Sequence, residues 1–94
     1  AAGRLPFVVE LLEKEELINE EILTSLRTSW GLNTASLADR YHLDLFQIKG
    51  ASITKLTALE LIHAEGKTLT LTRKGKLLAD SIAAEIFIDS HDLL

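Results

Sequence analysis

The histidines are the side chains of this sequence best suited to chemistry, since a neutral imidazole can bind metals and carry protons near neutral pH. They are His42, His63 and His91. A metal site needs several converging ligands, and no two of these histidines share the spacing of a helical pair. We therefore interpret His42 as a loop residue, His63 as a strand-face residue and His91 as a tail residue.

Basic side chains form a second candidate group. Lys67, Arg73, Lys74 and Lys76 lie within ten residues of one another. Such a run could touch phosphate groups, and with the nearby imidazole it makes His63, Arg73 and Lys74 the candidate ligand contacts. The alternative is a solvated turn and helix start. We favour that alternative because the net charge of the chain is −4.

Acidic side chains gather near the N-terminus. Glu13, Glu16 and Glu20 fall on one face of a helix. Carboxylate metal sites need converging, desolvated oxygens, so we interpret this run as a solvated helical turn. The sequence has no cysteine, which removes thiolate-held zinc and iron–sulfur clusters. No nucleophile elbow, P-loop or dinucleotide fingerprint is present. We therefore predict no catalytic, cofactor-binding or metal-binding residue in this chain.

Hydrophobic periodicity predicts a first helix over residues 13–30. Its apolar stripe contains Ile18, Ile22, Leu26 and Trp30. Gly31 then supplies a left-handed stop. A shorter helix follows over residues 35–41, capped by Asn33 or Thr34, because either side chain can accept from the free amides of the first turn.

The middle of the chain changes its period. Residues 45–60 form one helix weakened at Gly50, or two short helices. Alternation of leucine and threonine then predicts a hairpin, with strands at 61–64 and 68–72 around a turn at 65–67.

A final helix is predicted over residues 73–88, with Thr72 as its cap. Its stripe is formed by Leu78, Ile82 and Ile86, flanked by Leu77 and Ala79. Gly75 in the first turn implies that the helix start passes close to the hairpin. We divide the chain into an entry segment or linker (1–12), one domain (13–88) and a frayed tail (89–94). The predicted fold is mainly α with a small β-hairpin, a winged-helix-like domain.

Length and composition agree with this division. The chain has 94 residues, enough for one domain. No apolar run approaches the roughly 20 residues of a membrane span, and the first residues do not show the pattern of a signal peptide. Methionine is absent, so we expect the chain to be an excised fragment. The absence of cysteine is compatible with a cytoplasmic origin. The acidic balance makes nucleic acid an unlikely partner.

Three stretches of the sequence resemble one known family. The first is Asn19-Glu20 with the segment 24–32, the second is Leu37 with Tyr41, and the third is the segment 69–75 with Leu78, 80–82 and Ile86-Phe87. Together they are similar to the C-terminal domain of the oxygen-independent coproporphyrinogen III oxidase family, closest to its haem-chaperone branch. The resemblance covers roughly residues 5–88. The chain departs from it at His42 and near Glu60, where relatives usually have glycine.

The resemblance implies a cytoplasmic parent protein with a [4Fe-4S] cluster and S-adenosylmethionine in an N-terminal radical-SAM barrel. Such a parent either decarboxylates coproporphyrinogen III oxidatively or handles haem. The family's CxxxCxxC motif has no counterpart here, so this fragment has no catalysis of its own. It is expected to pack on or cover the barrel, with Arg27, Thr28 and Trp30 as candidate inter-domain contacts. Porphyrin or haem is then a candidate ligand, and Trp30 a candidate stacking surface.

Two other functions remain open. One is a DNA-binding winged helix, with Lys49 and Lys55 beside the recognition helix and a basic wing. The segment 52–59 contains no Arg, Asn or Gln, the side chains that most often read bases, which weighs against this alternative. The other is an interaction module that binds another protein through its helical faces.

Overall fold

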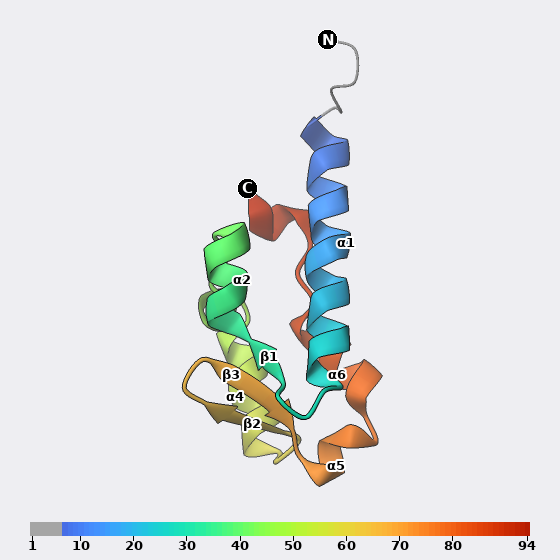
Figure 1. The fold of residues 1–94 in the computed structure, drawn as a ribbon, viewed down its shortest axis with the longest axis vertical. Helices are drawn as coiled ribbons and strands as arrows, with labels where there is room; N and C mark the ends of the chain where they lie inside the picture. The colour runs from blue at the N-terminus through green and yellow to red at the C-terminus, as the bar shows by residue number, and fades with distance from the viewer. Residues whose placement is uncertain (1–6) are drawn as a thin grey trace.

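The computed structural model describes residues 7–94 of the chain. These residues form a mainly helical domain with one small antiparallel sheet, which confirms the predicted fold class (Figure 1). The elements are α1 (Phe7–Leu26), β1 (Leu32–Asn33), α2 (Thr34–Tyr41), α3 (Leu45–Ile48), α4 (Gly50–Ala58), β2 (Ile62–Glu65), β3 (Thr68–Leu71), α5 (Arg73–Lys76), α6 (Ala79–Ile86) and the 3-10 helix η1 (Ser90–Leu93). Among the described residues, no helix combines the length and the apolar character needed to cross a membrane.

The first helix starts earlier than its acidic stretch suggests. α1 begins at Phe7 and ends at Leu26, so both bounds of the predicted helix 13–30 are wrong; residues 7–12 of the predicted entry segment are helical, and residues 1–6 lie outside the described part. The segment from Phe7 to Leu26 contains neither glycine nor proline, so nothing in it opposes a helix. Ile18, Ile22 and Leu26 are buried, as their spacing predicts.

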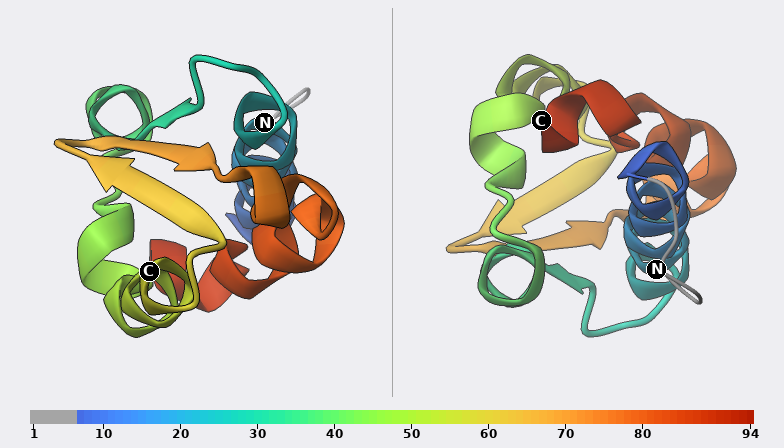
Figure 2. Two further views of the ribbon diagram at one scale, coloured as in Figure 1. Left: turned by 90° about the horizontal axis from the view of Figure 1, so that it is seen from below. Right: turned by 90° about the horizontal axis from the view of Figure 1, so that it is seen from above.

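The sheet has three strands in the order β1-β3-β2, all antiparallel. The hairpin of β2 and β3 was predicted, but β1 was not, because two residues are too few to show a period of two. Leu32 of β1 pairs with Leu69 of β3, and both side chains are fully buried. Figure 2 shows the hairpin between α2 on one side and α4 on the other, with α1 standing beside the sheet.

Two of the predicted helices are divided. Residues 45–60 contain α3 and α4 with a break at Lys49. Of the two predicted alternatives, the one with two short helices is therefore correct. The predicted helix 73–88 is split into α5 and α6 at Leu77 and Leu78. Thr72 caps α5 as predicted, because its hydroxyl accepts from the Gly75 amide at 3.0 Å.

The C-terminal tail is ordered against the domain, so the prediction that it is frayed is wrong. Ile88 is buried, and Asp89 caps η1 with a reciprocal pair of hydrogen bonds to Asp92. The two amide–carboxylate distances are 3.0 and 3.1 Å. Leu93 also packs against the core. A short polar tail is usually exposed to solvent, whereas this one packs on the domain through these contacts.

Two residues adopt the left-handed conformation that glycine tolerates best. His42 ends α2 with φ 54°, and Glu60 follows α4 with φ 60°. A residue other than glycine at such a φ destabilises the folded state by about 1–2 kcal/mol. Replacing it with glycine regains only part of this, because glycine also makes the unfolded chain more flexible.

We expect His42→Gly and Glu60→Gly each to raise the free energy of unfolding by about 0.5–1 kcal/mol in urea denaturation. His63→Gly, in an extended strand, should lower it; equal shifts for all three would contradict the argument.

Candidate functional site

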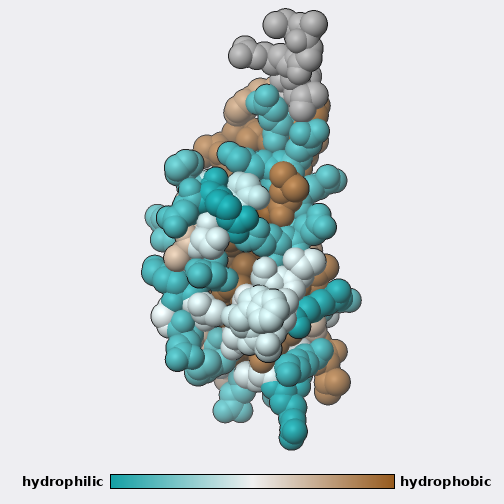
Figure 3. Space-filling view, viewed as in Figure 1, coloured by the Kyte–Doolittle hydropathy of each residue, from teal (hydrophilic) through white to brown (hydrophobic). Residues whose placement is uncertain are grey.

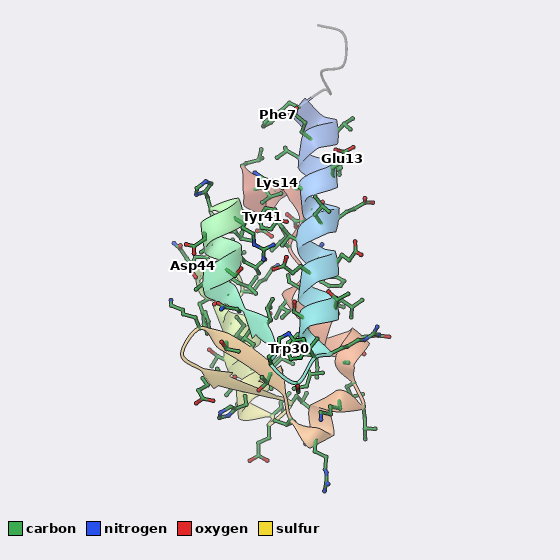
Figure 4. The ribbon with its side chains drawn as sticks, in the orientation of Figure 1. Phe7, Glu13, Lys14, Trp30, Tyr41 and Asp44 are labelled. Atoms are coloured by element: carbon green, nitrogen blue, oxygen red, sulfur yellow. The ribbon has the colours of Figure 1, made fainter. Side chains whose placement is uncertain are left out.

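The turn after α1 carries the three residues predicted to contact another domain. Arg27, Thr28 and Trp30 lie together there, past the end of the helix. The Thr28 hydroxyl donates to the Ser25 carbonyl at 2.6 Å and accepts from the Gly31 amide at 3.1 Å, so this side chain holds the turn in shape. Trp30 is 75% exposed and lies at the front of the turn between α1 and β1 (Figure 4). It is therefore not a core residue, although its spacing placed it on the buried stripe.

A hollow of about 580 Å³ opens beside this turn. Arg27 forms one wall, paired with Asp80 at the start of α6. Leu77 and Leu78 also line the hollow, and their side chains are 87% and about half exposed, while Lys76 and Ser81 add polar groups. We call Arg27, Leu77, Leu78 and Asp80 of this hollow, together with Trp30 on the same turn as Arg27, the α1-end surface. It combines exposed apolar side chains with one ion pair, the composition typical of a protein contact.

The candidate ligand contacts also come together in space. A second hollow, of about 450 Å³, is lined by Thr57, Glu60, Ile62, His63, Thr72, Arg73 and Lys74. The Lys74 ammonium lies 3.4 Å from the carbonyl of Leu59, and the His63 imidazole lies 3.9 Å from the carboxylate of Glu65. This hollow can offer two cations to an anionic group, but no pair of side chains in it is arranged as nucleophile and base.

The basic residues expected beside a DNA-recognition helix are occupied within the domain. The ammonium of Lys55 lies 2.8 Å from the carboxylate of Glu85, and that of Lys49 lies 3.8 Å from Asp92. Phosphate binding at these positions would have to compete with both ion pairs. The arrangement around α4 therefore does not favour the DNA-binding alternative.

The histidines and the acidic run do not meet one another. His42 and His91 are exposed at separate places, and Glu13, Glu16 and Glu20 lie on the exposed side of α1. Within residues 7–94, no group of three or more His, Cys, Asp or Glu side chains is placed to hold a metal ion.

One ion pair ties α2 to α1. The Arg40 guanidinium donates to both carboxylate oxygens of Glu21, at 2.6 Å for the Nη1–Oε1 contact. The hydrogen bond to Glu21 raises the pKa of Arg40 above its usual value. The guanidinium also lies 5.4 Å from the centre of the Tyr41 ring. The pair fixes the end of α2 beside α1.

Sequence reasoning missed the apolar half of the α1-end surface. Leu77 and Leu78 were assigned to the flank and the stripe of one long helix, whereas they lie at the break between α5 and α6. Gly75 was the available signal. A Cβ at this buried position would overlap the carbonyl oxygen of Leu61, so α5 must approach the hairpin closely, as the glycine predicted. Leu77 and Leu78 follow this close approach and are exposed, which the helical pattern did not indicate.

Comparison with known proteins yields one finding. The family model described as "HemN C-terminal domain" matches residues 12–78, which is more than half of the chain. No curated protein and no solved structure matches this chain. The matched region runs from α1 to the break before α6 and includes the whole sheet. The chain therefore belongs to the HemN C-terminal domain family.

Proposed function

We propose that this chain is the accessory domain of a cytoplasmic radical-SAM protein of the coproporphyrinogen III oxidase type, which acts as an oxidase or as a haem chaperone. Its role is to pack on the catalytic barrel and cover part of it. The family match supports the parent class, and the exposed α1-end surface supports docking. The chain contains no cysteine, so a [4Fe-4S] cluster does not fit its donor set. The cluster and S-adenosylmethionine would belong to the barrel, and this domain contributes no reacting group.

The α1-end surface has the parts of a docking contact. Trp30 and Leu77 supply apolar area, which stabilises a contact by roughly 25 cal/mol for each Å² removed from water. The exposed pair of Arg27 and Asp80 lies at the rim of the hollow, where it would orient the contact more than strengthen it. Large aromatic side chains that become buried usually dominate the binding energy of such interfaces.

Docking predicts a measurable loss when Trp30 is truncated. In the full-length protein, Trp30→Ala is expected to weaken barrel contact by about 2 kcal/mol, and Arg27→Ala by less, because the first removes a buried anchor and the second a rim charge. Hydrogen exchange should show residues 27–30 and 76–81 better protected in the full-length protein than in the isolated chain. Both variants should reduce that difference, while Leu59→Ala, at a half-exposed site elsewhere, should not. Equal protection in both proteins would contradict docking at this surface.

A second part of the proposal is contact with the tetrapyrrole. The convergence of His63, Arg73 and Lys74 in one hollow favours it, since two cations and an imidazole could hold an anionic ligand. Absorbance titration of the chain with haemin tests this contact. Saturable binding weakened in Arg73→Ala supports it, and binding unchanged by that substitution contradicts it.

A further inference from the structure

The apolar stripe of α1 continues beyond the domain core. Ile18 is fully buried, and Leu11 and Phe7 precede it by two and three helical turns on the same face. Leu11 is only half-buried, while Phe7 and Val8 are 65% and 64% exposed. Figure 3 shows hydrophobic side chains gathered at the upper end of the molecule among hydrophilic ones. The lower half of α1 thus packs on this domain, and its upper half presents the same kind of face to solvent.

A groove accompanies this exposed face. It measures about 380 Å³ and is lined by Phe7, Glu10, Leu11, Glu13, Lys14, Leu17 and Tyr41. Figure 4 shows Phe7 and Lys14 on the side of α1 that faces α2, with Tyr41 between the two helices. The ion pair of Arg40 and Glu21 links α2 to α1 in the same region of the molecule. We call it the α1–α2 groove.

The half of α1 that carries this groove is acidic. Residues 7–20 contain one lysine and five glutamates, which are Glu10, Glu13, Glu15, Glu16 and Glu20. Of these, Glu10 and Glu13 line the groove itself, together with Lys14. None of the five glutamates forms an ion pair with another residue of the part of the chain that the structure describes, whereas Glu21 does. Two copies of this face would repel each other, so charge complementarity favours a partner whose apolar side chains are flanked by lysine and arginine.

The position of the groove indicates where such a partner comes from. The matched family is a C-terminal domain, so the rest of the parent protein precedes α1 in the chain. The chain enters α1 at its upper end, next to the groove (Figure 1). A helix of 20 residues is about 30 Å long, so the α1-end surface lies far from this entry point.

We infer that the α1–α2 groove and the exposed upper face of α1 bind an apolar segment flanked by lysine and arginine, supplied by the preceding part of the same protein. This contact rests on the proposed accessory role and adds to it a second docking site with a defined chemistry. It makes the upper half of α1 an inter-domain element, and it explains why a helix carries an apolar face longer than its own domain can bury.

Hydrogen exchange of the full-length protein against the isolated chain tests this contact. Amides of residues 7–17 should exchange at least tenfold more slowly in the full-length protein. Phe7→Ser and Leu17→Ser should each reduce that protection, and neither should unfold the domain, because both side chains are largely exposed. The double variant Glu10→Lys/Glu13→Lys should reduce it as well, and protection in the unchanged protein should fall at high salt. Glu65→Lys, an exposed charge reversal on the hairpin, is the matched control.

The outcomes separate this inference from the proposed function. Equal exchange of residues 7–17 in both proteins overturns the inference, whatever happens at the α1-end surface. Protection of residues 7–17 without protection of 27–30 keeps the inference and moves the docking site away from Trp30. An effect of Glu65→Lys as large as that of the double variant overturns the charge complementarity. Protection in the isolated chain that rises with its concentration identifies a second copy as the occupant and overturns the inference.

Discussion

Replacing Gly31 by alanine is expected to lower the free energy of unfolding by about 3 kcal/mol. Gly31 has φ 76°, a conformation that costs an alanine about 1–2 kcal/mol. The added Cβ would also overlap the Leu69 carbonyl oxygen and the Thr70 side chain, and overpacking of this kind costs about 1–3 kcal/mol. Because Leu69 pairs with Leu32 across the sheet, the strand cannot move aside without breaking that pairing.

Urea denaturation followed by circular dichroism measures this loss. Gly66→Ala is the matched control, because Gly66 has φ 60° but no atom lies within 4 Å of the Cβ it would gain. We expect the control to lose only the conformational cost of about 1 kcal/mol. The difference between the two variants then isolates the steric overlap at the sheet. Equal losses would show that β3 relaxes without cost, contrary to the close packing seen around Leu69.

Local signals explain the parts of the fold that were predicted correctly. Asn33 caps α2 through bonds of 3.0 and 3.2 Å to the amides of Ala35 and Ser36, and Thr72 caps α5. The leucine–threonine alternation identified β3. In each of these features the interacting residues lie within a few positions of one another, so a short stretch of sequence is enough to recognise them.

The missed features depend on contacts between distant parts of the chain. β1 exists because Leu32 meets Leu69, which no short-range pattern indicates. The predicted helix after the hairpin is divided just beyond Gly75, where the chain approaches the Leu61 carbonyl too closely for a Cβ. The start of α1 was missed for another reason: its apolar side chains Phe7, Val8 and Leu12 are at least half exposed, so they form no buried stripe and were taken for a linker. Tertiary packing, rather than propensity, decides the first two cases.

The candidate site residues were also predicted only where they depend on local sequence patterns. His63, Arg73 and Lys74 are neighbours because a hairpin and a helix start bring them together, and both elements were visible in the sequence. The partner of Arg27 is Asp80, which lies 53 residues away and was not predicted. Leu77 was assigned to a helical flank, and its exposure became clear only from the break between α5 and α6.

Asn19 is expected to be the side chain that holds the C-terminal tail. Its amide nitrogen donates to the Ile88 carbonyl at 2.9 Å, and its amide oxygen accepts from the Ile88 N–H at 2.9 Å. Ile88 is only 2% exposed, so both of its backbone groups would lose their partner away from water in Asn19→Ala. An unpaired buried group costs about 1–3 kcal/mol, so we expect a loss of about 2–4 kcal/mol and faster exchange of the Ile88 amide.

Comparison of Asn19→Ala with two other variants identifies the cause of that loss. Asn19→Asp keeps the acceptor for the Ile88 N–H but turns a second acceptor toward its carbonyl, so it should destabilise while slowing Ile88 exchange relative to alanine. Thr24→Ala removes an exposed hydroxyl that donates to the Glu20 carbonyl in the same helix, and it should change stability by less than about 0.5 kcal/mol. A loss in Asn19→Ala no larger than in Thr24→Ala would mean that water replaces the amide. The apolar contacts of Ile88 and Leu93 would then hold the tail alone.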